Sequence, residues 1–255
     1  MPKLNSNGVE IYFEVHGKGP VLLLTHGFSA TCDMWRGQIG DLSKDHTVVI
    51  WDLRGHGQSD YPEDPAAYSE ALTVGDMAAL LDRVGGGRAI VGGISLGGYM
   101  SLAFYRAHPD RVSALLIIDT GPGFKKEESR EAWNKQALDR AVLFETKGLA
   151  ALQSANRERV TANHRSAEGL ARAARGMMTQ HDSSLIELLP KIKVPSLIIV
   201  GAEDTPFLAA ADYMAVKIPG ARKVVIPAAG HTVNIDQPKA FIEAVQTFLD
   251  HTRPY

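Results

Sequence analysis

Hydrophobic and polar residues alternate near the N-terminus, and continuous apolar runs follow further along the chain. Alternation over Val9–Val15 is the pattern of a half-exposed strand, and Asn7-Gly8 before it is a turn signal. The later runs do not alternate; they are Val21–Leu24, Val48–Trp51, Ala89–Val91, Leu115–Ile118, Leu197–Val200 and Val224–Ile226. Continuous apolar strands are typical of a parallel sheet that helices cover on both faces.

Helical patterns lie between these runs. Apolar residues recur at helical spacing from Met77 to Val84, and Thr73 with Asp76 resembles a capping box at the start of this helix. The stretch after Ser95 is expected to end before Pro109, and a terminal helix is expected to begin at Pro238. The alternation predicts an α/β fold with a mostly parallel, doubly wound sheet and an antiparallel edge at the N-terminus.

Residues 123–189 interrupt the alternation, because they contain helical patterns and no convincing strand. One helix is expected around Trp133, Ala137, Leu138, Ala141 and Val142, and a second around Leu170, Ala173, Ala174, Met177 and Met178. They could be extra core helices. We favour a helical cap inserted into a core formed by residues 1–122 and 190–255, because ligands of open α/β sheets bind beyond the carboxyl ends of the strands.

Composition narrows the class of protein further. The chain has 255 residues, of which 45% are hydrophobic and 22% charged, so one α/β domain with a sizeable core is expected. A formal net charge of -2 argues against a nucleic-acid partner. No apolar run approaches the ~20 residues that cross a bilayer. The N-terminus lacks the features of a signal peptide, so we expect a soluble, cytoplasmic protein without a membrane partner.

The sequence contains no motif that indicates a metal or a cofactor. The nine histidines are scattered and form no metal-binding spacing such as H-E-x-x-H. Cys32 is the single cysteine, which excludes an intramolecular disulfide, and its position beside Asp33 favours it less as a nucleophile than the serine described next. We therefore expect no metal and no cofactor, and the sequence does not predict an oligomeric state.

Gly93-Ile94-Ser95-Leu96-Gly97 matches the G-x-S-x-G nucleophile elbow. A serine on a sharp strand-to-helix turn has a strained backbone, and side chains two residues to either side would collide with it. The bare pattern is a weak signal, but here an apolar run ending near Val91 precedes it and a helical pattern follows. Ser95 is therefore the predicted nucleophile.

A serine hydroxyl needs a base, and the base needs an acid to orient it. His231 follows the run Val224–Ile226, and Asp204 follows the run Leu197–Val200. The chain order Ser95, Asp204, His231 is the order expected for an α/β-hydrolase fold. Glu203 and Asp119 are rival acids; Asp204 is preferred because it lies further beyond the end of its strand than Glu203.

Two backbone N–H groups are candidates for an oxyanion hole. Leu96 follows the nucleophile, and Phe28 lies in the loop after Val21–Leu24. His26 in the same loop is a rival base, but we expect it to brace the loop by hydrogen bonding. Phe28, Trp133 and Met177 are candidates for the lining of the substrate pocket.

Five blocks of this sequence resemble those of the α/β-hydrolase superfamily. They are His26-Gly27-Phe28, Asp52 to Asp60, Gly93 to Gly98, Gly201 to Asp204 and Gly230-His231. The resemblance implies the same roles for Ser95, Asp204, His231, Phe28 and Leu96, and a structural role for the loop Arg54 to Asp60. Two branches of the superfamily remain close to this sequence. One is the small carboxylesterases, and the other is the 3-oxoadipate enol-lactonases, whose cap Trp133-Asn134 and Gly148 to Leu152 resemble.

These observations predict a serine hydrolase of the carboxylesterase type, which cleaves small to medium acyl esters through an acyl-enzyme intermediate. The alternative is a lactonase that attacks a cyclic ester with the same residues. A third reading is a non-catalytic receptor for a small molecule, against which the complete set of three catalytic side chains argues.

Overall fold

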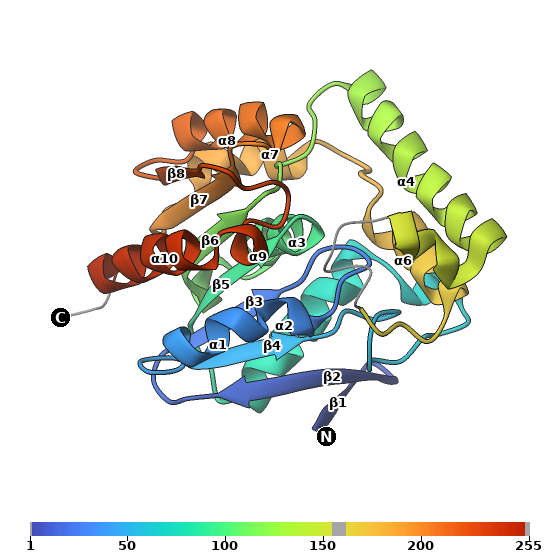
Figure 1. The fold of residues 1–255 in the computed structure, drawn as a ribbon, viewed down its shortest axis with the longest axis horizontal. Helices are drawn as coiled ribbons and strands as arrows, with labels where there is room; N and C mark the ends of the chain where they lie inside the picture. The colour runs from blue at the N-terminus through green and yellow to red at the C-terminus, as the bar shows by residue number, and fades with distance from the viewer. Residues whose placement is uncertain (1, 155–161, 253–255) are drawn as a thin grey trace.

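The computed structural model of the chain describes residues 2–154 and 162–252. Within them, eight strands form one sheet in the order β1-β2-β4-β3-β5-β6-β7-β8 (Figure 1). The strands are β1 (Lys3–Ser6), β2 (Val9–His16), β3 (Val21–Thr25), β4 (Thr47–Trp51), β5 (Ala89–Ile94), β6 (Val112–Ile118), β7 (Ser196–Gly201) and β8 (Arg222–Ile226). β1 and β2 pair antiparallel, β2 joins β4 antiparallel, and all later pairs are parallel. The predicted sheet and its antiparallel edge are confirmed.

Helices cover both faces of the sheet. The α-helices are α1 (Arg36–Leu42), α2 (Glu70–Arg83), α3 (Leu96–Ala107), α4 (Glu127–Lys147), α6 (Ala167–Met177), α7 (Ser184–Leu188), α8 (Thr205–Lys217), α9 (Val233–Asp236) and α10 (Pro238–Thr252). Short 3-10 turns are η1 (Cys32–Trp35), η2 (Pro65–Ala67), η3 (Pro109–Arg111), η4 (Gly148–Ser154) and η5 (Leu189–Lys191). None of the helices in the described part of the chain is long and apolar enough to cross a membrane.

Alternate side chains of the central strands belong to two separate apolar cores. Leu23, Val49 and Val91 face one way and pack with buried residues of α2, α3 and α8. Leu22, Val48 and Ile50 face the other way and pack with α1, α9 and α10. Both faces of these strands are therefore buried in apolar cores, which explains why the strands are apolar throughout rather than alternating.

The segment between β6 and β7 contains α4 and α6, which pack against each other beside the sheet (Figure 1). The shorter α7 packs on α3 instead. The buried side chains of α4 are Ala137, Ala141 and Phe144, whereas Leu138 and Val142 are exposed. The helix was expected, but these two residues do not lie on its buried face.

The sequence pattern also misplaced the start of one helix and missed one strand. The helix α2 begins at Glu70, where the Ser69 hydroxyl accepts a hydrogen bond from the Leu72 N–H. Thr73 lies inside the helix, bonded to the Ser69 carbonyl, so the predicted capping box is wrong. The strand β1 was not expected, because its residues are polar and largely exposed.

A buried ion pair fixes the loop after β4 to α2. The Arg54 guanidinium donates to both carboxylate oxygens of Asp76 at 2.7 and 2.6 Å and to the Ala67 carbonyl at 2.6 Å. The two side chains are 1% and 0% exposed. Burial raises the pKa of Asp76, while the bond to Arg54 opposes this shift.

Replacing Arg54 with methionine should destabilise the protein strongly, because the Asp76 carboxylate would stay buried without a counter-ion. We expect the free energy of unfolding to fall by about 3–5 kcal/mol, measured by urea denaturation. The double variant Arg54→Met, Asp76→Leu removes both charges and should recover most of this loss. A double variant as unstable as the single one would contradict this account.

Candidate active site

The carboxyl ends of the parallel strands place four loops at one edge of the sheet. Phe28 follows β3, Ser95 follows β5, Asp204 follows β7 and His231 follows β8. Ser95, Asp204 and His231 line one pocket of about 550 Å³ together with the candidate pocket residues Phe28, Leu96, Trp133 and Met177. The structure therefore brings every predicted site residue to the same cavity.

Ser95 occupies a strained turn between β5 and α3. Its backbone has φ 55° and ψ −118°, a conformation that non-glycine residues seldom adopt. A side chain at Gly93 would lie 2.5 Å from the Gly97 carbonyl carbon, and one at Gly97 would lie 2.2 Å from the Thr25 carbonyl oxygen. The two glycines thus allow β5, α3 and the end of β3 to approach closely.

Hydrogen bonds hold this turn in place. The Ser95 N–H donates to the Ile118 carbonyl at 2.9 Å, and the Thr120 hydroxyl donates to the Ser95 carbonyl at 2.7 Å. Leu96 is the first residue of α3, so its N–H has no acceptor within the helix. The Phe28 side chain is buried, with its ring edge-on to those of His56 and Phe144. This ring connects the loop after β3 to α4.

Asp204 and His231 are joined by a hydrogen bond of 2.8 Å between Oδ2 and Nδ1. Asp204 is 5% exposed, whereas Glu203 is exposed and Asp119 bonds to other groups. The Phe207 ring stacks on His231, with the ring centroids 5.0 Å apart. A hydrogen bond at Nδ1 fixes the imidazole tautomer and leaves Nε2 as the nitrogen that can accept a proton.

Ser95 and His231 are neighbours at one corner of this pocket, since both also line a second, small cavity together with Gly27 and Thr232. Among the described residues, no hydrogen bond joins the Ser95 hydroxyl to the imidazole. Such bonds are often long in enzymes without substrate and shorten when the substrate binds.

Asp119 connects the two loops that carry Asp204 and His231. Its carboxyl oxygens accept hydrogen bonds from the Gly201 N–H at 2.9 Å and the Val233 N–H at 3.2 Å. The side chain is 1% exposed. Burial, with the nearby Asp204 charge as a smaller cause, raises the pKa of Asp119 to about 8. The raised pKa favours the protonated form of Asp119 and so opposes a second negative charge beside Asp204.

Three buried histidines support the loop that contains Phe28. His26 accepts from the Leu53 N–H and donates to the Gly27 carbonyl, which is the bracing role expected for it. His56 accepts from the Ser29 N–H. His164, from the segment before α6, accepts from the Gly57 N–H at 3.1 Å and donates to the Ser29 carbonyl at 3.0 Å.

The three rings are packed in a row and stay uncharged. Ring centroids lie 5.2 Å apart for His26 and His56 and 5.5 Å apart for His56 and His164. Burial lowers the pKa of both His26 and His164 to about 4. Burial and the two neighbouring rings lower the pKa of His56 as well.

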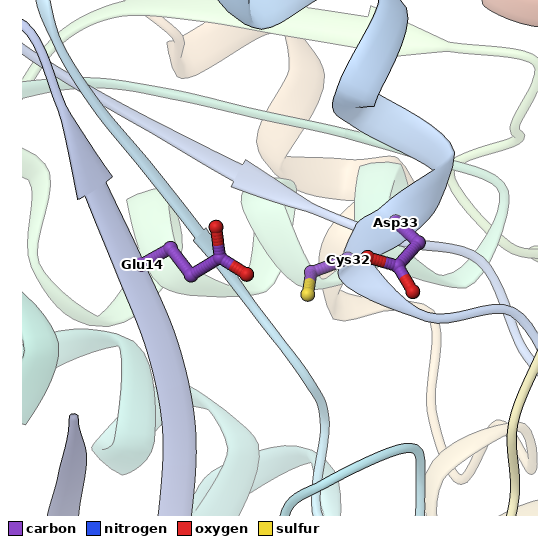
Figure 2. A group of neighbouring side chains, drawn as sticks. All are labelled: Glu14, Cys32 and Asp33. Atoms are coloured by element: carbon purple, nitrogen blue, oxygen red, sulfur yellow. The ribbon is translucent and has the colours of Figure 1, made fainter. Parts of the chain in front are cut away.

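One other group of side chains has the composition of a metal site. Ligand atoms of Glu14, Cys32 and Asp33 lie within 4.8 Å of one another, and Figure 2 shows Glu14 on β2 facing the start of η1. Arg36 bonds to both carboxylates and lowers the pKa of Glu14 to about 2. Burial raises the pKa of the Cys32 thiol, which keeps it protonated. Because Arg36 already pairs with both carboxylates, we assign no metal here.

Several pocket residues were missed in the sequence. Tyr99, Gln136, Arg140, Gln180 and Phe207 all line the pocket. Gln136 and Arg140 follow Trp133 at helical spacing on α4, which is a usable signal once Trp133 is placed in the pocket. Nothing in the local sequence marks Gln180 or Phe207.

The fold and this constellation define an α/β-hydrolase. The sequence profile of the alpha/beta hydrolase family matches residues 21–244, and the chain belongs to that family.

Similar proteins carry the names of different hydrolase activities. The chain is 28% identical to a 2-(acetamidomethylene)succinate hydrolase of Mesorhizobium japonicum, over 92% of this chain and 89% of that protein. Among solved structures it resembles an esterase from Thermogutta terrifontis, with 28% identity, a TM-score of 0.83 and full coverage of both chains. It also resembles the enol-lactonase of Burkholderia xenovorans LB400, with 28% identity and a TM-score of 0.78 over 98% of this chain and 100% of that one.

Replacing Asp119 with alanine should weaken the edge of the sheet, because the N–H groups of Gly201 and Val233 would lose their acceptor in a buried place. Each unsatisfied donor costs about 1–3 kcal/mol, and the fall in the free energy of unfolding should lie in this range or above. Urea denaturation of Asp119→Ala and of Asp119→Asn measures it. The asparagine variant retains one acceptor and should lose less; equal losses would count against the bridging role.

Replacing His164 with glutamine, which can accept and donate in the same way, should remove an acid-sensitive term from stability. The unfolded histidine gains a proton below its reference pKa of about 6.5, whereas the folded one does so only near 4. Stability from this group is therefore complete above pH 6.5 and is lost as the pH falls toward 4. Relative to wild type, His164→Gln should gain up to about 1.4 kcal/mol per pH unit in this interval.

Urea denaturation at pH 7, 6 and 5 gives the comparison. His181, which is exposed, provides the control replacement His181→Gln, because an exposed imidazole is hydrated in both states. A difference between His164→Gln and wild type that does not change with pH would refute the assignment of a buried, neutral imidazole.

Proposed function

We propose that the protein is a serine hydrolase that cleaves carboxylic esters of small to medium acyl groups. Ser95 is the nucleophile, His231 the base and Asp204 the acid that orients and stabilises the imidazolium. The observation that carries this proposal is the common pocket, in which a strained serine at a helix N-terminus and a histidine bonded to a buried aspartate meet.

In the proposed mechanism, the Ser95 hydroxyl attacks the ester carbonyl as His231 Nε2 takes its proton. The oxyanion that forms accepts hydrogen bonds from the backbone N–H groups of Leu96 and Phe28. The imidazolium then protonates the departing alcohol, which leaves an acyl group on Ser95. Water that gives its proton to His231 attacks this acyl-enzyme and releases the carboxylic acid.

Residues 123–189 act as the cap in this proposal, and Trp133 and Met177 contact the substrate. Supporting contacts tie α4 to the rest of the pocket: the Trp133 Nε1–H donates to the Met178 carbonyl at 2.7 Å, and the Phe144 ring meets Phe28. The pocket is about 550 Å³, a volume suited to a small molecule.

A lactonase is the second candidate, because a lactone carbonyl can be attacked by the same serine and the chain resembles an enol-lactonase over nearly its whole length. The products distinguish the two substrates: an ester releases a separate alcohol, whereas a lactone yields one hydroxy acid or its keto form. Parallel rates on short p-nitrophenyl esters and a panel of lactones would rank them.

Replacing Ser95 with alanine should lower ester turnover by about 10⁴-fold or more while the protein remains folded, because the hydroxyl forms the covalent intermediate. The measurements are p-nitrophenyl acetate hydrolysis, covalent labelling by a fluorophosphonate and circular dichroism. Ser43→Ala, at the end of α1, is the matched control and should keep both activity and labelling. Labelling that persists in Ser95→Ala would overturn the assignment.

A further inference from the structure

The wall of the pocket formed by α4 is polar, in contrast to its apolar surroundings. Trp133, Gln136 and Arg140 are spaced by three and four residues, so they lie on one face of the helix, and all three line the pocket. Trp133 is fixed by its hydrogen bond to Met178. Gln136 and Arg140 therefore face the same cavity as Ser95 and His231.

Arg140 lines the pocket without an anionic partner among the described residues, unlike two of its basic neighbours. Lys135 pairs with Asp139 on α4, and Arg175 of α6 pairs with Glu145, each at 2.8 Å. No described residue forms an ion pair or hydrogen bond with the Arg140 guanidinium. The residue is exposed, so its guanidinium is open to a ligand that enters the pocket. An anion bound there would pair with this charge without displacing a protein partner.

The acids that line the pocket do not compensate this charge. Among the described lining residues, Asp204 is the one carboxylate, and His231 already holds it. Arg140 is the one arginine or lysine among the described lining residues, and no carboxylate there pairs with it. Its planar fork of N–H groups can bind both oxygens of a carboxylate.

Gln180 adds a second unpaired polar group. Its Oε1 is buried without a hydrogen-bond partner, and the residue is 7% exposed. The backbone of Gln180 is fixed to α4, since the Asn134 amide accepts from its N–H at 2.7 Å and donates to its carbonyl at 2.9 Å. Gln180 lines the pocket, so a rotation of its side chain would present this unsatisfied amide to a polar ligand.

We propose that the substrate of this pocket carries a carboxylate besides the scissile ester or lactone, and that Arg140 binds this carboxylate. Gln136, one helical turn before Arg140, and Gln180 provide further hydrogen bonds to the polar part of the substrate. The inference rests on the proposed function for its reaction. The proposed binding of a carboxylate rests instead on the unpaired side chains of Arg140 and Gln180.

A pair of esters with acyl chains of equal length tests this proposal: mono-p-nitrophenyl glutarate, which is anionic, and p-nitrophenyl pentanoate, which is neutral. The wild-type protein should favour the glutarate ester. In Arg140→Gln, the ratio of kcat/KM for glutarate to that for pentanoate should fall about tenfold or more, mainly through KM. This ratio should fall less in Arg140→Lys, which keeps the charge but not the planar fork of N–H groups.

Lys147→Gln is the matched control, because it removes one positive charge from the exposed last turn of the same helix, outside the pocket lining. Its glutarate-to-pentanoate ratio should equal that of the wild-type protein. An Arg140→Gln ratio within about twofold of wild type would overturn the proposal. So would an equal fall of the ratio in Lys147→Gln, since that indicates a general charge effect.

Calorimetry with glutarate separates failure of this inference from failure of the proposed function. Glutarate should bind to Ser95→Ala, and binding should be lost in Ser95→Ala, Arg140→Gln. If wild type and Ser95→Ala hydrolyse both esters equally slowly, the proposed function fails, yet Arg140-dependent glutarate binding would still support the carboxylate site. Binding that is identical with and without Arg140 would refute it.

Discussion

The close approach of three backbone segments at the end of β5 is the constraint on which the rest of the site depends. Side chains at Gly93 or Gly97 would collide with main-chain atoms, so the turn forms only with glycine at both positions. A strained residue such as Ser95 costs of order 1–3 kcal/mol and persists because its surroundings hold it. Here the Ile118 carbonyl and the Thr120 hydroxyl do so. The same crowding puts Ser95 at the first turn of α3 and against the loop of Phe28.

The loops that carry Phe28, Asp204 and His231 are held by buried groups without charge rather than by ion pairs. Asp119 joins the loops after β7 and β8, and its raised pKa favours its neutral form beside Asp204. The buried rings of His26, His56 and His164 are likewise uncharged, so each ring can accept from one N–H and donate to one carbonyl. Neutral groups pay a smaller desolvation cost than charged ones. They can therefore fix several loops at a sheet edge without placing a competing charge near His231.

The sequence predicted the central sheet well because strands covered on both faces must be apolar throughout, as Leu22–Leu24 are. It did not reveal β1, whose edge position leaves polar residues exposed and removes the apolar signal. The start of α2 was misplaced because Thr73 and Ser69 are equally good capping residues, and only tertiary packing selects between them. The sequence did not reveal the buried face of α4 either: small Ala137 and Ala141 are buried, while Leu138 and Val142 are exposed.

The two sides of the pocket also differ in how far the sequence predicted them. On the core side, each candidate residue follows a recognisable strand, so chain order and turn chemistry were enough to bring Ser95, Asp204 and His231 together. On the α4 side, Arg140 and Gln136 have the composition of an ordinary solvated helix face, and no periodicity separates an arginine that faces a pocket from one that faces water. What separates them is the absence of a partner among the described residues, which is a property of the folded chain. The proposed reacting residues are therefore marked by local sequence geometry, whereas the proposed role of Arg140 rests on contacts that only the folded chain shows.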